Sequence, residues 1–276
     1  MRAGFTFREQ HSSDFEGVTV RTNDRPIRPE TKEETFSSQN SDGERSFACA
    51  NPYGHEFYES KIYQMEMNAT ASGLSELQSK VAKLSRWIMG SGILIFDDTP
   101  LVKWAARIVD TVQYMPEHGG KYAKFVVKYK VKPFAELIFS TIEGPCLDDE
   151  IFLDDDIPID IGEYFYFEGA GIHVVKNIGD VPVRPVITVT EATKPVTISV
   201  AGTDITVPKN AEIDCANYTV RDMNGKSLMK EIQGDFFELT VGNNVMKVTA
   251  SENVHIEVEY EPKYIYSVDA EDMRLD

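Results

Sequence analysis

The spacing of hydrophobic residues predicts one amphipathic helix in a chain that otherwise alternates like short strands. The helix is expected over about residues 75–89, where Ser75 and Gln78 have the spacing of a capping box and Gly90 and Gly92 follow. Its apolar stripe recurs at steps of three and four residues and consists of Leu74, Leu77, Val81, Leu84 and Ile88. We expect this stripe to pack on a sheet of the same domain.

Around the helix, the first half of the chain reads as strands joined by local turns. Ile62–Met67 alternates between apolar and polar residues, as a half-buried strand does, and Trp104–Tyr114 and Tyr122–Val131 are longer strands. Asp42-Gly43 is a favourable hairpin turn. Residues 1–140 are therefore predicted to form an α+β domain that is mostly β, with a single helix.

From residue 172 onward the pattern is entirely that of short strands. Apolar runs recur at roughly 8–12-residue spacing, which is typical of an antiparallel β-sandwich; the runs are Val183–Val189, Val196–Val200, Ile205–Val207, Phe236–Leu239, Val245–Val248 and Val254–Tyr260. Turn residues separate them at Asn177–Asp180, Gly202–Asp204, Asn224-Gly225 and Gly242–Asn244. Residues 172–276 are predicted to be a β-sandwich, and the molecule is mainly β overall.

Charge divides the chain at a similar place. The formal charge is 28 − 45 = −17; residues 1–139 carry 18 basic and 18 acidic side chains, and residues 140–276 carry 10 and 27. Residues 141–171, which contain the runs Asp148–Glu150 and Asp154–Asp156, are interpreted as an acidic connector. A neutral first half suits close packing against copies, whereas an acidic second half stays solvated.

Composition excludes several classes of function. The acidity argues against a nucleic-acid binder, which needs clustered Lys and Arg. No stretch approaches the ~18 consecutive apolar residues that a bilayer-spanning helix requires, so we expect no membrane insertion. Residues 1–10 have no apolar core of a signal peptide, which predicts synthesis in the cytoplasm.

The sequence offers no catalytic, cofactor or metal motif. The five histidines are scattered without metal-ligand spacing, and the cysteines, Cys49, Cys146 and Cys215, are expected to be free buried thiols. The acidic run fails as an EF-hand, because Ile159 stands where glycine is needed and Phe165 where glutamate is needed when Asp154 is position one. Sequence does not give the separation of carboxylate pairs that glycoside hydrolysis needs. We predict a protein that is not an enzyme and has no cofactor.

Taken in order, these elements resemble the distal tail protein family of long-tailed, non-contractile phages. In the first half the resemblance rests on Phe5-Thr6-Phe7, Ser12-Ser13, Phe15, Gly17, Arg25-Pro26-Ile27, Tyr58–Met67, a helix ending near Trp87, Ile93–Asp98, Lys103–Ile108 and Ala123–Phe134. In the second half it rests on Asn177-Ile178-Gly179, Arg184–Ile187 and Phe237–Asn244. Ser37–Ser41 stands where the family often has Pro-Gly, so the family pattern does not define the length and register of the following hairpin.

This resemblance implies a structural virion protein at the phage tail tip, made in the bacterial host cytoplasm. Its N-terminal domains would form a homohexameric ring through which DNA passes, next to the tail tube protein. Its C-terminal domains would be galectin-like sandwiches that contact a tail-associated hub, fibre or receptor-binding protein. The implied function is a baseplate hub that joins the tail tube to the adhesion apparatus.

A carbohydrate-binding β-sandwich for host attachment is the alternative, either alone or as a second role of the C-terminal domain. Sugars stack on exposed aromatic rings. The candidate contacts with a carbohydrate or a partner are Tyr164, Tyr166, Tyr218, Tyr264 and Tyr266.

Overall fold

In a computed structural model, the chain forms two compact units. The structure describes residues 4–32, 35–37, 44–46, 57–110, 112, 114–138 and 165–268. Unit 1 comprises Met1–Ala135 together with Ile265–Ser267, and unit 2 comprises Glu136–Tyr264 and Val268–Asp276. Because residues 139–164 lie outside the described part of the chain, the expected boundaries 1–140, 141–171 and 172–276 remain a proposal. The sequence did not indicate that residues 265–267 belong with unit 1.

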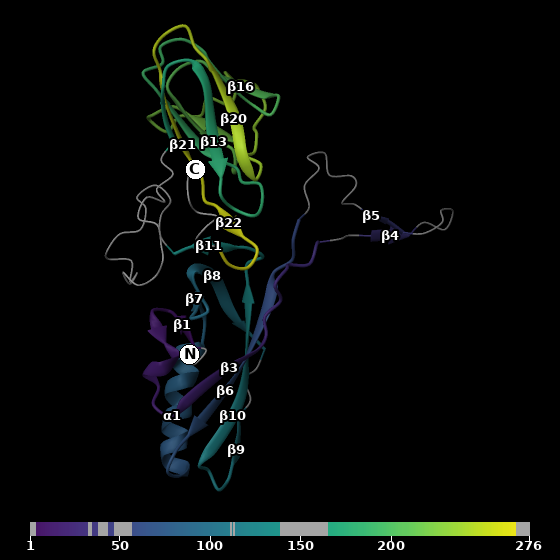
Figure 1. The fold of residues 1–276 in the computed structure, drawn as a ribbon, viewed down its shortest axis with the longest axis vertical. Coiled ribbons are helices and arrows are strands. Elements are labelled where there is room, and N and C mark those ends of the chain that lie inside the picture. Colours follow the sequence, from purple (N-terminus) through teal and green to yellow (C-terminus); the bar gives the residue numbers. More distant parts are fainter. Residues whose placement is uncertain are drawn as a thin grey trace. The chain divides into compact units, whose positions relative to one another are not determined.

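An antiparallel sheet with the order β2-β1-β7-β8-β10-β6-β3 is the scaffold of unit 1 (Figure 1). Its strands are β1 (Phe5–Phe7), β2 (Gln10–His11), β3 (Val18–Asp24), β6 (Lys61–Thr70), β7 (Ser91–Phe96), β8 (Thr99–Val109) and β10 (Tyr122–Val131). A short strand, β9 (Tyr114–Glu117), also pairs with β10. The predicted strand over Tyr122–Val131 is confirmed, and the strand predicted over Ile62–Met67 extends further at both ends as β6. Trp104–Tyr114 is divided between β8 and β9.

Helix α1 (Leu74–Ile88) packs on one face of this sheet (Figure 1). Leu77, Leu84, Trp87 and Ile88 are buried against the alternate sheet residues, whereas Leu74, at the start of the predicted stripe, is half exposed. The largest buried rings on the sheet side are Phe5, Phe7, Tyr63, Phe96, Trp104 and Tyr129. The expectation that the stripe packs within its own domain is therefore confirmed.

The start of α1 corrects one sequence prediction. The N-cap is Gly73, without a side-chain cap, so Ser75 and Gln78 form no capping box. Instead, the backbone N–H and hydroxyl of Ser72 both donate to Glu76. The helix begins one residue earlier than predicted because the Glu76 carboxylate, in the first turn, satisfies the preceding backbone from inside the helix.

The remaining elements of unit 1 and of the segment that follows are short. A 3-10 helix, η1 (Ser12–Asp14), follows β2, and β4 (Thr35–Ser37) pairs with β5 (Glu44–Ser46) in an antiparallel hairpin. The predicted turn Asp42-Gly43 lies between these strands but outside the described residues. Two further strands are β11 (Ala135–Leu137) and β22 (Lys263–Tyr264).

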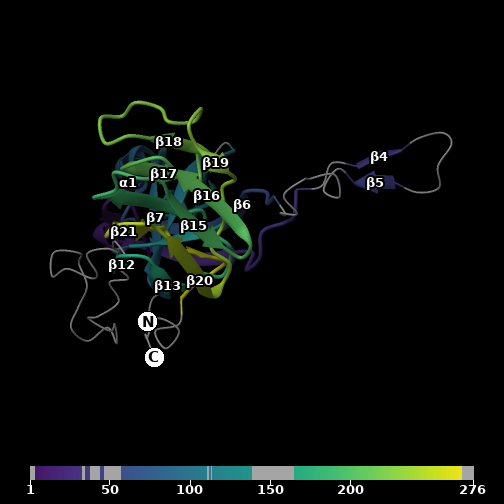
Figure 2. The same ribbon diagram turned by 90° about the horizontal axis from the view of Figure 1, so that it is seen from above.

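Unit 2 consists of two five-stranded antiparallel sheets that enclose one core (Figure 2). One sheet has the order β12-β21-β14-β17-β18 and comprises β12 (Phe165–Glu168), β14 (Val186–Thr190), β17 (Ala211–Asp214), β18 (Thr219–Arg221) and β21 (His255–Glu259). The other has the order β13-β20-β15-β16-β19 and comprises β13 (Gly171–Asn177), β15 (Val196–Val200), β16 (Thr203–Val207), β19 (Gln233–Gly234) and β20 (Gly242–Thr249). The predicted all-β sandwich is confirmed.

Two local predictions in unit 2 are wrong. Phe236–Leu239 is not a strand; within it only Leu239 forms an isolated bridge, to Val183, although Phe237 and Leu239 are buried. Gly242–Asn244 is the beginning of β20 rather than a turn. In both segments the polarity of the residues reflects their burial or exposure. Whether the backbone forms a strand depends instead on whether a neighbouring strand lies beside it.

Candidate functional site

The five tyrosines singled out from the sequence do not form one site. Tyr164 lies outside the described residues, Tyr266 belongs to unit 1, and Tyr166, Tyr218 and Tyr264 belong to unit 2. Tyr166 lies on β12 and Tyr218 immediately before β18, so they occupy opposite edges of the same sheet. Each tyrosine therefore has to be considered with its own neighbours.

Tyr166 is the most accessible of the four described tyrosines, with 42% of its surface exposed. Its hydroxyl hydrogen-bonds with Nδ1 of His255, and the two rings meet edge to face with centroids 5.4 Å apart. Nε2 of His255 lies 3.0 Å from the Glu191 carboxylate. An exposed ring bordered by an imidazole and a carboxylate has the chemistry to contact a sugar or a polar protein surface.

Tyr218 and Tyr264 are held within unit 2. The Arg184 guanidinium lies 4.7 Å from the centre of the Tyr218 ring, and Phe236 meets the same ring edge to face at 5.4 Å. Tyr264 is 1% exposed, so its ring is part of the folded interior. Only the outer side of Tyr218 would reach a ligand without rearrangement.

Tyr266 takes part in a contact that attaches the end of the described chain to unit 1. Arg25 donates to its hydroxyl and lies 4.5 Å from the centres of both the Tyr266 and Phe96 rings. The same guanidinium forms two 2.8 Å hydrogen bonds to Asp98, one to each carboxylate oxygen. Arg25 thereby joins the end of β3 to the β7–β8 turn and to residue 266.

Lys61 completes this attachment from inside the unit. Its residue is only 4% exposed, and Nζ donates to the backbone carbonyl of Ile265 at 2.7 Å. Nζ also lies 4.0 Å from the centre of the Trp104 ring. Burial, and secondarily the charge of Arg25, lower the pKa of Lys61 to about 7.

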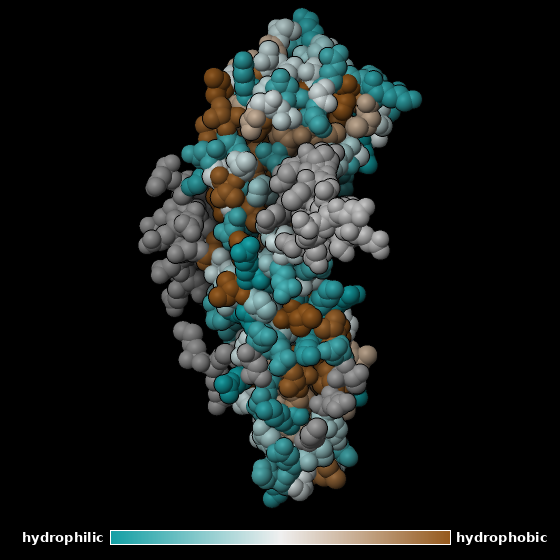
Figure 3. All heavy atoms as spheres, turned by 90° about the vertical axis from the view of Figure 1, so that its right-hand side faces the viewer, coloured by the Kyte–Doolittle hydropathy of each residue, from teal (hydrophilic) through white to brown (hydrophobic). Residues whose placement is uncertain are grey.

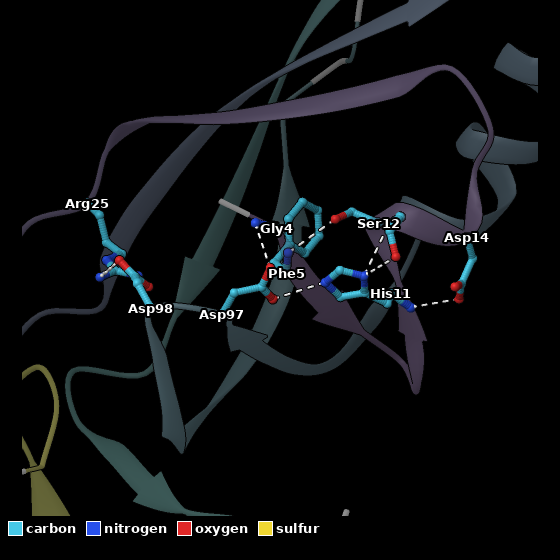
Figure 4. A network of polar contacts seen from close by, with 9 residues as sticks. Gly4, Phe5, His11, Ser12, Asp14, Arg25, Asp97 and Asp98 are labelled. Carbon is cyan, nitrogen blue, oxygen red and sulfur yellow. Dashed lines mark hydrogen bonds and ion pairs between the residues drawn. The ribbon is translucent and has the colours of Figure 1, made fainter. Parts of the chain in front are cut away.

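A second polar network holds the first strand to the β7–β8 turn (Figure 4). His11 Nε2 lies 3.0 Å from one oxygen of Asp97, and the other oxygen accepts the Gly4 N–H at 2.8 Å. His11 Nδ1 accepts the Ser13 backbone N–H at 3.1 Å and lies 2.6 Å from the Ser13 hydroxyl. The backbone N–H of His11 donates in turn to the Asp14 carboxylate, which completes a capping box at the start of η1.

Ser13, His11 and Asp97 are the residue types of a hydrolytic triad, but their hydrogen bonds are those of a cap. Nδ1 of His11 already accepts a backbone N–H, so Nε2 is the protonated nitrogen and donates its hydrogen bond to Asp97. A Cβ on Gly4 would lie 2.5 Å from Asp97 and 2.8 Å from the His11 ring, so the network is closed around the backbone of the first strand. Its evident role is to fix that strand.

Sequence reasoning missed these networks because their members are far apart. His11 and Asp97 are 86 residues apart and Arg25 and Asp98 are 73 apart. The free thiol expected at Cys215 is confirmed as buried, and burial raises its pKa to about 11, whereas Cys49 and Cys146 lie outside the described residues. Among the described residues, no group of three or more His, Cys, Asp or Glu side chains could hold a metal ion, and no helix could span a membrane.

Comparisons with known proteins find a sequence match within unit 2 and a similar fold over most of the chain. Residues 178–264 match the family model described as siphovirus-type tail component, C-terminal domain. The fold is similar to that of the crystal structure of Dit, the distal tail protein of phage SPP1, with a TM-score of 0.58 and 14% identity, covering 95% of this chain and 98% of that chain. The phage P2 baseplate structure in its activated conformation with calcium matches at a TM-score of 0.36 and 8% identity, covering 96% of this chain and 100% of that chain, too distant to add to the argument. No curated protein matches the chain significantly.

Residues 178–264, which lie within unit 2, thus match the C-terminal domain of siphovirus-type tail components. The likeness to SPP1 Dit, at 14% identity, shows a shared fold over 95% of this chain.

Proposed function

We propose that this chain forms the hub that joins the phage tail tube to the adhesion apparatus, as a homohexameric ring. The observation that carries the proposal is the match of the sandwich to the tail-component domain, on a chain whose whole fold follows that of the SPP1 protein. That protein is described as a paradigm of the hub adsorption apparatus of phages that infect Gram-positive bacteria. Unit 1 would build the ring around a lumen that DNA traverses.

The partners in this proposal are the tail tube protein on one side and a tail-associated hub, fibre or receptor-binding protein on the other. The charge distribution supports this division, because a half with no net charge closes a ring without self-repulsion. The acidic half is compatible with a solvated position at the periphery.

Imaging tests the hub directly. We expect class averages of the parent particle's tail tip to contain a six-fold ring of this chain, located with an antibody fragment or a fused density marker. Native mass spectrometry of the purified protein would give the stoichiometry. A tail tip without a ring of this chain would overturn the proposal.

A second role in carbohydrate binding is favoured by the exposed Tyr166 with His255 and Glu191 beside it. We expect a glycan-array signal from the full chain that Tyr166→Ala abolishes and Tyr166→Phe retains, because stacking requires the ring rather than its hydroxyl. A signal unaffected by Tyr166→Ala, or no signal from the wild type, would remove this role from Tyr166.

A further inference from the structure

Among the described strands, the two sheets of unit 2 have four edges, and β13 forms the longest of them. The edge strands β12, β18 and β19 have four, three and two residues, whereas β13 has seven. β13 pairs with β20 on one side in unbroken register, and with no described strand on the other (Figure 1). An edge strand presents a row of unpaired backbone N–H and C=O groups, which proteins usually shield with short strands, bulges or proline. β13 is long, regular and free of proline, so it has the shape to accept a further strand.

Aliphatic side chains follow the outward face of β13 and of its neighbour. Burial alternates along β13: Val175 faces the core and is fully buried, whereas Ile172 and Val174 point outward with 72% and 50% of their surface exposed. Val245 on β20 is directly opposite Val174 and is 59% exposed. We call Ile172, Val174 and Val245 the aliphatic strip; Figure 3 shows hydrophobic residues gathered at the left side of unit 2. Adjoining exposed apolar side chains with a polar border are typical of binding surfaces.

A lysine stands at each end of the aliphatic strip. Lys247 on β20 is directly opposite Ile172, and Lys176 follows Val174 on the same face of β13. On the outward side of the five described strands of this sheet, the single acidic residue is Asp204 on β16, two strands away from β20. This is the reverse of the balance in the second half of the chain, which carries 10 basic and 27 acidic side chains. The strip therefore favours an occupant with aliphatic side chains and carboxylates.

We propose that β13 binds an extended segment of a different tail protein, which adds to the sheet as a further strand. Backbone hydrogen bonds to β13 supply affinity in this mode of recognition, and alternate side chains of the added strand supply specificity. Pairing would involve residues 171–175, because the Tyr260 hydroxyl already donates to the Lys176 carbonyl. The added strand carries aliphatic residues at alternate positions over the strip and a carboxylate toward Lys176 or Lys247. The inference rests on the proposed function in that other tail proteins adjoin this chain.

Charge argues against a second copy of this chain as the occupant. A second β13 would bring another Lys176 and Lys247 to the same face and leave the lysines of both copies without opposite charge. Like charges brought together across an interface disfavour the contact. A strand that carries carboxylates has no such penalty.

Photo-crosslinking in the assembled particle tests the occupant directly. The variant is Ile172→p-benzoylphenylalanine in the full chain, which keeps an apolar side chain in the aliphatic strip. Purified particles are irradiated, and mass spectrometry identifies the peptide joined to position 172. We expect a peptide of a different protein in which aliphatic residues alternate with polar ones and at least one is acidic. Glu212→p-benzoylphenylalanine, on the exposed side of β17 in the other sheet, should not capture that peptide.

Lysines placed within the strip test whether its apolar surface holds the partner. Val174→Lys with Val245→Lys, added to the chain with the crosslinker at position 172, should lower the crosslink yield per incorporated chain at least about tenfold. Met223→Lys with Met229→Lys makes the same change at exposed apolar residues of unit 2 outside this sheet, and should leave the yield unchanged. Circular dichroism melts of the purified chains show whether each variant is folded.

Several results would overturn the proposal. They are a crosslink to a second copy of this chain, to residues 139–164 of the same chain, to a peptide without the expected alternation, or to nothing. Equal yields from the two double-lysine variants would also overturn it. Each of these leaves the hub function standing if the tail tip contains a ring of this chain. Conversely, the expected crosslink in a particle without such a ring would support strand addition and remove the hub.

Discussion

At the scale of single residues, buried and crowded charges have the most informative positions in this protein. Lys61 is enclosed by Trp104, Tyr63 and the carbonyl of Ile265, and it is the residue through which the end of the described chain reaches into unit 1. A lysine buried in this way weakens the fold when protonated, but its hydrogen bond fixes Ile265.

The lowered pKa of Lys61, about 7 against 10.5 in an unfolded chain, makes a pH-dependent contribution to stability. Between these values the unfolded lysine holds a proton that the folded one lacks, so the free energy of unfolding rises with pH. Relative to Lys61→Met, the wild type should gain up to about 1.4 kcal/mol per pH unit between pH 8 and 10. Urea denaturation at several pH values measures it.

Lys83→Met, on the exposed side of α1, controls for the loss of one positive charge. If the free energies of unfolding of the wild type and Lys61→Met change in parallel with pH over this range, the pKa of Lys61 is not lowered in the folded protein, and the prediction is wrong.

Glu259 gives a prediction of the opposite sign. Because its pKa is raised by burial and by Glu257, its ionisation destabilises the folded state, and stability falls as pH rises through the folded pKa. Glu259→Gln should be more stable than the wild type at pH 7 by roughly 0.2–1 kcal/mol, the range for interactions between charges near the surface. The gain should disappear below about pH 4, where both forms are neutral. Glu231→Gln is the exposed control, and chemical denaturation at pH 3.5 and 7 gives the comparison.

At the scale of elements, the close approach of two backbones can require glycine at a position that the pattern of apolar and polar residues does not single out. Gly234 forms β19 with φ +98°, and a Cβ there would lie 2.0 Å from the Asp204 carbonyl oxygen on β16. Gly225, in the turn after Asn224, has φ +79° but nothing within 4 Å. Both glycines adopt a left-handed backbone conformation, but only at Gly234 does the missing Cβ also allow β16 and β19 to approach each other.

Alanine at these two positions should therefore differ greatly in effect. Gly225→Ala should cost about 1 kcal/mol, which is the left-handed conformation alone. Gly234→Ala should cost about 3 kcal/mol or more, because the β16–β19 backbones must separate. Thermal melts of both variants measure the difference; equal costs would show that β19 tolerates displacement.

At the scale of the whole molecule, two units share one chain and all of its net charge lies in residues 140–276. The two tryptophans, Trp87 and Trp104, are both buried in unit 1, so their fluorescence reports that unit alone. Separate cores are expected to unfold as separate cooperative transitions.

Gly234→Ala should accordingly lower the midpoint temperature of the unit 2 transition, followed by far-ultraviolet circular dichroism. The midpoint of the unit 1 transition, followed by tryptophan fluorescence, should stay within about 2 °C of the wild type. Leu84→Ala, in the core under α1, is the reciprocal variant. It should lower the free energy of unfolding of unit 1 by about 2–5 kcal/mol and so lower the midpoint temperature reported by tryptophan fluorescence. If each variant moves both transitions equally, the units unfold as one.

The sequence determined what depends on periodicity and composition: helix α1, the long strands β6 and β10, the sandwich of residues 172–276, the charge division and the resemblance to the distal tail family. These follow from hydrophobic burial on one face of an element, which local spacing records. The start of α1 and the absence of a strand at Phe236–Leu239 were decided by neighbouring groups rather than by spacing.

Only the tertiary structure decided which distant residues meet. The His11–Asp97 and Arg25–Asp98 contacts and the separation of the candidate tyrosines all depend on strand order and register. Electrostatic and hydrogen-bond interactions act over a few ångströms in space, and one sequence position carries no record of the strand that will lie beside it.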